Sequence, residues 1–196
     1  MCDSLFGGVL VMKCLVGVLS MCMVAGGASA TQHQTLHEHG TAALNIVVSG
    51  AEIGLSLSVP SMDVVGFERP AADDDDRALV AIAISDLSKP LELFVLPAEA
   101  GCFTTAANVT LTGETLGQVE DTEDGADKGD SEYHSEFQGE YVIQCQDMDA
   151  LKTIEFAYFD RFENTQNLKI QAELADGSHN LDVTRENPVW DLPKRP

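Results

Sequence analysis

Alternating apolar and polar residues mark two neighbouring segments near the start of the chain. In 41–49 (TAALNIVVS) and 52–59 (EIGLSLSV), every second residue is apolar. Successive side chains of a β-strand point to opposite faces, so each segment predicts a strand with one face in a core. Gly50-Ala51 separates the two segments and Pro60 ends the second, which indicates a β-hairpin.

Five further segments have strand-like composition or alternation, giving about seven strands in all. Most of them are joined by short turns, including an Asp-Gly pair at 176–177, so the pattern predicts largely antiparallel pairing. The further segments are 102–112, 133–145, 152–159, 168–175 and 178–184.

One main helix is expected between the hairpin and the later strands. Asp73–Asp76 place acid where the helix macrodipole favours it, and 77–86 supply the body of the helix. The four aspartates lack the spacing of an EF-hand calcium loop. Residues 91–97 fit either a helical turn or a strand. The predicted fold is therefore α+β and mainly β, with an antiparallel sheet.

The segment 113–132 is acidic, contains several glycines and has almost no core residues, so we expect a mobile acidic surface loop there. Its charge belongs to a strongly acidic chain with 32 Asp and Glu residues, 11 Lys and Arg residues and a net charge of −21. This charge disfavours nucleic acid and anionic membrane surfaces as partners.

The first thirty residues have the pattern of an export signal. Lys13 precedes an apolar stretch, and Ala28-Ser29-Ala30 is an A-x-A cleavage site. The apolar stretch is too short for a membrane-spanning helix. We expect residues 1–30 to be a cleavable signal peptide of a Gram-negative bacterium, and residues 31–196 to form a single periplasmic domain without a membrane span.

Only two cysteines, Cys102 and Cys145, lie beyond the predicted cleavage site. An even pair in an exported chain predicts one disulfide. Closing a loop of this length would stabilise the fold by about 3–4 kcal/mol.

Histidines and carboxylates supply the candidate chemistry. His37 and His39 lie two residues apart before the first strand, and His134 and Glu136 share the polar face of 133–145. Zinc accepts histidine nitrogen and carboxylate oxygen, usually with four ligands. These four residues form a candidate zinc site if the N-terminal arm lies beside the start of 133–145; otherwise the pair is an incidental part of a frayed arm. Secondary candidates are His33, Asp160 and His179.

Motifs typical of enzymes are missing from the sequence. It contains no G-x-S-x-G, no H-E-x-x-H and no glycine-rich phosphate loop. We therefore expect a protein that is not an enzyme.

An ordered series of short motifs resembles the ZrgA-like family of zinc-regulated periplasmic proteins. The series consists of His37-Glu-His39-Gly40, Pro60-Ser-Met-Asp-Val-Val-Gly66-Phe67-Glu68, Leu96-Pro97, Gly101-Cys102, His134-Ser-Glu-Phe137, Tyr141, Cys145, Phe159-Asp-Arg161-Phe162 and Asn187-Pro188.

The resemblance implies an exported protein that binds zinc and is linked to zinc acquisition, with His37, His39 and His134 as ligands. Members of the family often carry a histidine-rich loop between the two cysteines, whereas 113–132 contains no histidine. The expected function is a periplasmic zinc-binding protein that assists zinc acquisition or buffering. Its expected partners are the zinc ion and a component of a zinc transport system. The alternative is an envelope protein-interaction module that binds no metal.

Overall fold

The computed structural model describes residues 38–116 and 132–194. The predicted signal peptide, His33, His37 and most of the predicted acidic loop lie outside the described residues.

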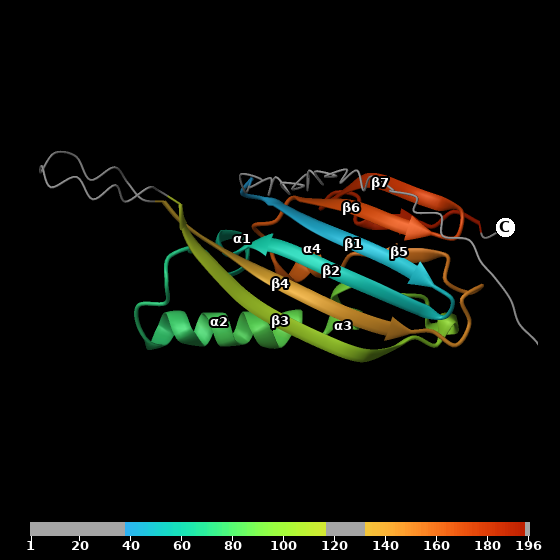
Figure 1. Ribbon diagram of the computed structural model, residues 1–196, viewed down its shortest axis with the longest axis horizontal. Coiled ribbons are helices and arrows are strands. Elements are labelled where there is room, and N and C mark those ends of the chain that lie inside the picture. The colour runs from blue at the N-terminus through green and yellow to red at the C-terminus, as the bar shows by residue number, and fades with distance from the viewer. Residues whose placement is uncertain (1–37, 117–131, 195–196) are drawn as a thin grey trace, which may run out of the picture. The chain divides into compact units, whose positions relative to one another are not determined.

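A mixed six-stranded sheet forms the body of the protein, with its strands in the order β3-β4-β2-β1-β6-β7 (Figure 1). A second sheet pairs two short strands, β5 and β8. The strands of the large sheet are β1 (Thr41–Ser49), β2 (Glu52–Pro60), β3 (Phe103–Leu116), β4 (Glu132–Gln144), β6 (Asn167–Leu174) and β7 (Gly177–Thr184); those of the small sheet are β5 (Thr153–Glu155) and β8 (Val189–Asp191).

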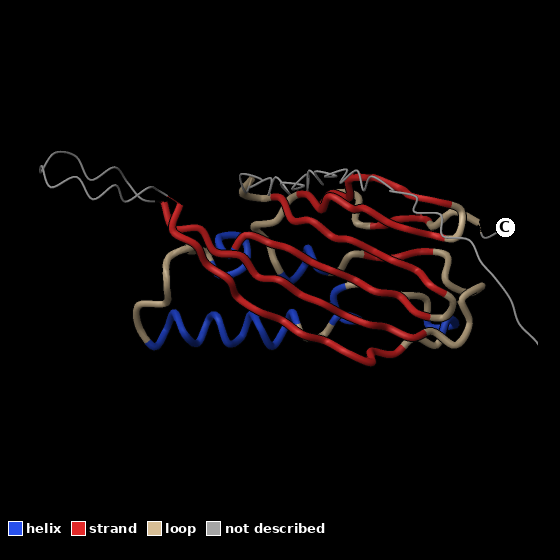
Figure 2. The backbone as a smooth tube through the Cα atoms, in the orientation of Figure 1, coloured by secondary structure: helices blue, strands red, loops and turns tan. Residues whose placement is uncertain are grey.

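The helices lie behind the large sheet, on one of its faces, and α2 runs alongside β3 and β4 (Figures 1 and 2). Among the helices of the described residues, α2 alone is longer than five residues, which agrees with the expectation of one main helix. The helices are α1 (Ser61–Val65), α2 (Asp74–Leu87), α3 (Pro90–Leu93) and α4 (Tyr158–Arg161), with a 3₁₀ turn at Ala98–Ala100.

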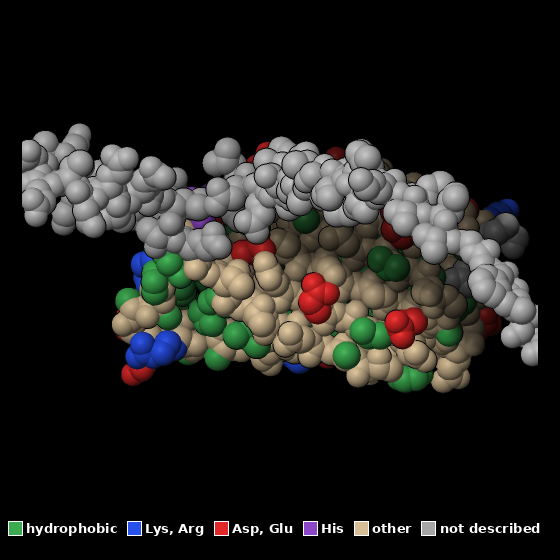
Figure 3. Space-filling model, in the orientation of Figure 1, with side chains coloured by type: hydrophobic (Ala, Val, Ile, Leu, Met, Phe, Trp, Pro, Cys, Tyr) green, Lys and Arg blue, Asp and Glu red, His purple; other side chains and the backbone are tan. Residues whose placement is uncertain are grey.

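The predicted alternation of the first hairpin and of β4 is confirmed. In β1 and β2 the apolar set that includes Leu44, Ile46 and Leu55 is buried, and in β4 the inward set includes Phe137 and Tyr141. These side chains meet apolar residues from the helical side to form one core. The face in view in Figure 3 carries few charged side chains, with separate acidic groups and scattered hydrophobic ones. Buried residues contributed from the helical side include Ala83, Leu87, Phe94, Phe156, Tyr158 and Phe159.

The expected mainly β fold with largely antiparallel pairing is confirmed, but three details of the strands differ from the expectation. First, β1 pairs with β6 in parallel, so the large sheet is not wholly antiparallel. Second, 152–159 is not one strand: β5 ends at Glu155 and α4 begins at Tyr158. Third, an eighth strand, β8, lies in the C-terminal segment, where no strand was predicted. In addition, β3 and β4 extend into the predicted acidic loop, through Leu116 and from Glu132.

The N-terminus of α2 carries a side-chain cap that can be tested by mutation. Oδ1 of Asp73 accepts the backbone N–H of Asp76 at 2.9 Å. Asp73→Ala is expected to lower the free energy of unfolding by about 1 kcal/mol, because it leaves this N–H without its capping acceptor. Asp75→Ala is the matched control, since it removes the same charge from the same turn but not the cap. Urea denaturation of both variants measures the difference, and equal losses would contradict the cap.

Candidate metal centre

The register of the sheet places His39 and His134 at the same level. Strands β1 and β4 flank β2, and both run antiparallel to it; Ser58 of β2 pairs with Ala43 on one side and Gln138 on the other. His39 lies four residues before Ala43, and His134 lies four residues before Gln138. Strand β2 ends at Pro60, before it reaches the level of the two histidines. The position between His39 and His134 at this end of the sheet is therefore not occupied by β2.

The carboxylate of Glu68 lies in that space and contacts both imidazoles. Its Oε1 is 3.1 Å from Nε2 of His39, and its Oε2 is 2.9 Å from Nδ1 of His134. The Glu68 side chain is 9% exposed, that of His134 is 15% exposed and that of His39 is 54% exposed. One buried carboxylate therefore joins the two histidines, and His39 forms the solvent side of the cluster.

The backbone around Glu68 is held by serine hydroxyls. Ser135 Oγ donates to the carbonyl of Glu68 at 2.8 Å, and Ser61 Oγ donates to the carbonyl of Phe67 at 2.8 Å. The two hydroxyls also contact each other, and both serines are buried. Since Ser61 begins α1 and Ser135 belongs to β4, these bonds fix the position of Glu68 relative to the sheet.

The turn that carries His39 is anchored through Gly40. Its N–H donates to both carboxylate oxygens of Asp63 at 2.9 Å, and its carbonyl accepts the N–H groups of Gln166 and Asn167. Gly40 has φ +81°, a conformation that L side chains rarely adopt. Burial raises the pKa of the Asp63 carboxyl, against the lowering effects of the Gly40 bond and of His39. His39 is therefore attached to both α1 and β6 through its neighbour.

The other predicted site residues that the structure describes do not contact Glu68 in any hydrogen bond or ion pair given for it. Glu136 is on the same face of β4 as His134, and its Oε1 accepts Nε2 of Gln138 at 2.9 Å. His179 is on β7, at the far edge of the sheet, and contacts Asp176 at 3.0 Å. Asp160 is exposed on α4 and lines a surface depression with Asp86 and Glu92, away from Glu68.

The donor atoms of the cluster fit zinc in kind. Imidazole nitrogen and carboxylate oxygen are both common zinc ligands. Within residues 38–116 and 132–194, however, no three His, Cys, Asp or Glu side chains are grouped closely enough to hold a metal ion. A complete site thus requires donors beyond the described cluster.

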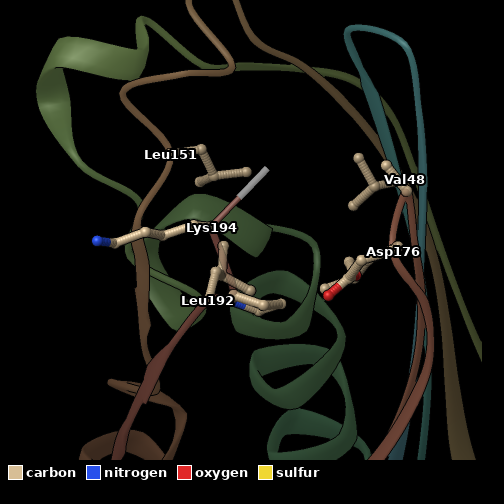
Figure 4. Close-up of a pocket in the computed structure, with 8 residues that line it drawn as sticks. Val48, Leu151, Asp176, Leu192 and Lys194 are labelled. Atoms are coloured by element: carbon tan, nitrogen blue, oxygen red, sulfur yellow. The ribbon is translucent and has the colours of Figure 1, made fainter. Parts of the chain in front are cut away.

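The cavity shown in Figure 4 is not part of this cluster. It is lined by Val48, Leu151, Asp176, Leu192 and Lys194, among others. Val48 lies near the end of β1, whereas His39 precedes its beginning, so the cavity is at the opposite end of the strand. The described residues that line it are largely apolar and include no histidine.

Comparison with protein families agrees with the resemblance in the motif series. A family model described as "ZrgA family zinc uptake protein" matches residues 36–192. The chain belongs to this family. The match covers the described cluster, and it ties the chain to zinc uptake without assigning a role to any residue. No curated protein matches the chain.

Among the described residues, no helix is both long and apolar enough to cross a membrane.

Glu68 is the residue of the cluster that the sequence did not predict as functional. It closes the motif Gly66-Phe67-Glu68, but it lies in a connection, where a carboxylate is normally solvated. A signal for the two histidines was available, because each lies four residues before a residue that pairs with Ser58 of β2. Using that signal requires knowledge of the strand pairing, and it does not identify Glu68.

Proposed function

We propose that this chain is a periplasmic zinc-binding protein that assists zinc acquisition or buffering, and that it is not an enzyme. His39 and His134 serve as zinc ligands, with His37 and Glu136 as the candidates for the remaining positions. The observation that carries the proposal is the meeting of His39 and His134 at Glu68. Membership of a zinc uptake family and a disulfide compatible with an oxidising compartment support it.

Zinc binding is expected to depend on pH in the direction set by histidine. Imidazole binds metal only as the neutral ring, and free histidine takes up a proton near pH 6.5. Residues 31–196 should therefore bind zinc with submillimolar affinity at about pH 7.5 and more than tenfold more weakly at about pH 5. Isothermal titration calorimetry at the two pH values measures this. Equal affinities would contradict histidine ligation, and millimolar affinity at the higher pH would contradict the proposed function.

A further inference from the structure

The outward face of α2 is apolar, although the exposed side of a helix in a globular protein is normally polar. Leu79 is 47% exposed and Ile82 is 50% exposed. No charged residue lies between Arg77 and Asp86, so this stretch of the helix has no charge to keep its outward face in water. In a chain with a net charge of −21, an exposed helix face without charge indicates a surface that another molecule covers.

Strand β3 is an edge of the large sheet, since β4 is its only partner among the described strands. A shift of register between Thr104 and Ala106 interrupts the start of β3, and the pairing is then regular. From Ala106 to Gly113 the strand is mostly exposed and contains no charged residue and no proline, the residues that normally protect an edge from pairing. The opposite edge, β7, carries His179 and Asp182. The edge that invites a further strand is therefore β3.

The edge of β3 and the apolar face of α2 lie on the same side of the molecule. The two elements contact each other, and hydrophobic side chains reach the surface at the margin where they lie (Figures 1 and 3). Leu111 of β3 is 39% exposed and pairs with buried Phe137, so it points to the face of the sheet that carries the helices. A strand added to β3 would thus bring its own helical layer beside α2.

We propose that the edge of β3 and the outward face of α2 form an interface between two copies of this chain. Antiparallel pairing of β3 with itself is symmetric about a two-fold axis, so each copy uses the same surface. The pairing joins the two large sheets into one. With the helices on the same face of both sheets, it also brings the two α2 helices side by side and antiparallel. The inference goes beyond the proposed function and requires no zinc.

The charges at the ends of α2 favour a second copy as the occupant. Asp74 and Asp75 lie in its first turn, and Lys89 follows its end with a side chain that is 46% exposed. Antiparallel helices place the acidic start of one copy beside Lys89 of the other, at both ends of the interface. An exposed ion pair contributes only about 0–1 kcal/mol, so these charges set the orientation, and burial of the apolar face supplies the affinity.

Sedimentation of residues 31–196 tests the proposal, with a chelator present so that no metal bridges two copies. One strand and one helix face per copy make a small interface, so we expect a micromolar dissociation constant and a dimer at about 100 µM. Salt of about 0.15 M gives a Debye length of about 8 Å, which screens most of the repulsion between the acidic chains.

Ile82→Lys should raise the dissociation constant at least about tenfold, because the two-fold axis places the new charge in the interface twice. The substitution makes the chain less acidic, so weaker association cannot come from greater overall repulsion. Val47→Lys is the matched control: Val47 is also 50% exposed, but it lies on β1, inside the sheet order. This control should dimerise as the wild type does. Circular dichroism checks that both variants are folded.

Hydrogen exchange of the backbone amides shows whether β3 is the pairing strand. The outward amides between Ala106 and Gly113 should exchange more slowly at about 100 µM than at about 1 µM, whereas amides of β7 should not change. In Ile82→Lys this difference should be lost. A dimer whose β3 amides exchange alike at both concentrations would overturn the strand pairing. A wild-type protein that is a monomer at about 100 µM would overturn the proposal and leave the surface to a different protein.

An Ile82→Lys variant that dimerises as tightly as the wild type would also contradict it, since α2 would then lie outside the interface.

Discussion

Replacing His39 and His134 together with alanine is expected to lower the zinc affinity of residues 31–196 by more than about 100-fold. The estimate starts from the 10–100-fold loss typical when a residue that only orients a ligand is removed. Removing two ligands should exceed that range. The variant also leaves the carboxylate of Glu68 buried without its two imidazole partners, so circular dichroism must first show that the fold is retained. Calorimetry at about pH 7.5 then measures the affinity.

His179→Ala is the matched control for the double variant. His179 also contacts a carboxylate, that of Asp176, but it lies on β7 at the far edge of the sheet. We expect its replacement to leave zinc affinity within about threefold of the wild-type value, since it removes an imidazole that takes no part in the cluster. A double variant that binds zinc as the wild type does would show that the histidines at Glu68 are not ligands.

Local pattern was enough to predict the strands that pair with their neighbours in sequence. The hairpin of β1 and β2 and the inward face of β4 follow from period-two alternation, because each of these strands has one face in the core and one in solvent. The parallel pairing of β1 with β6 did not follow. It joins residues more than a hundred positions apart, and nothing in the alternation of either strand identifies its partner.

The segment 152–159 shows where an apolar run is ambiguous. Ile154 and Phe156 alternate as a strand would, but Tyr158 and Phe159 are consecutive and both buried. A helical turn at α4 buries both rings, with Tyr158 stacked on Phe94 at 6.3 Å between ring centroids. Because short apolar runs fit strand and helix equally well, only the surrounding core decided between them.

The candidate site, like the fold, could be predicted from the sequence only in part. The spacing of His37 and His39 and the polar-face position of His134 could be stated from the sequence alone. That His39 and His134 come together depends on β2 lying between their strands and ending at Pro60. Glu68 reaches the same point because it follows α1, which begins directly after β2 and packs against β4. Sequence patterns thus miss those site residues, such as Glu68, that lie in a connection between helices or strands.

The largest expected effect on stability comes from the disulfide between Cys102 and Cys145, which the structure confirms. Cys102 immediately precedes β3 and Cys145 immediately follows β4, so the bond closes the open end of this hairpin. The cysteines are 43 positions apart, and a crosslink that closes such a loop restricts the unfolded chain by about 3–4 kcal/mol. Replacing both cysteines with serine should lower the melting temperature by about 10 °C.

The same double-serine variant separates stability from zinc binding. His134 lies at the other end of β4 from Cys145, and the pairing of β4 with β2 extends to Glu136, far from the disulfide. Zinc affinity at 25 °C should therefore stay within about threefold of the wild-type value, because the histidine cluster keeps its own anchors. Reductant should lower the melting temperature of the wild-type protein but not of the variant. A wild-type melting temperature that does not respond to reductant, although thiol titration shows the bond to be broken, would contradict the stabilising role of the crosslink.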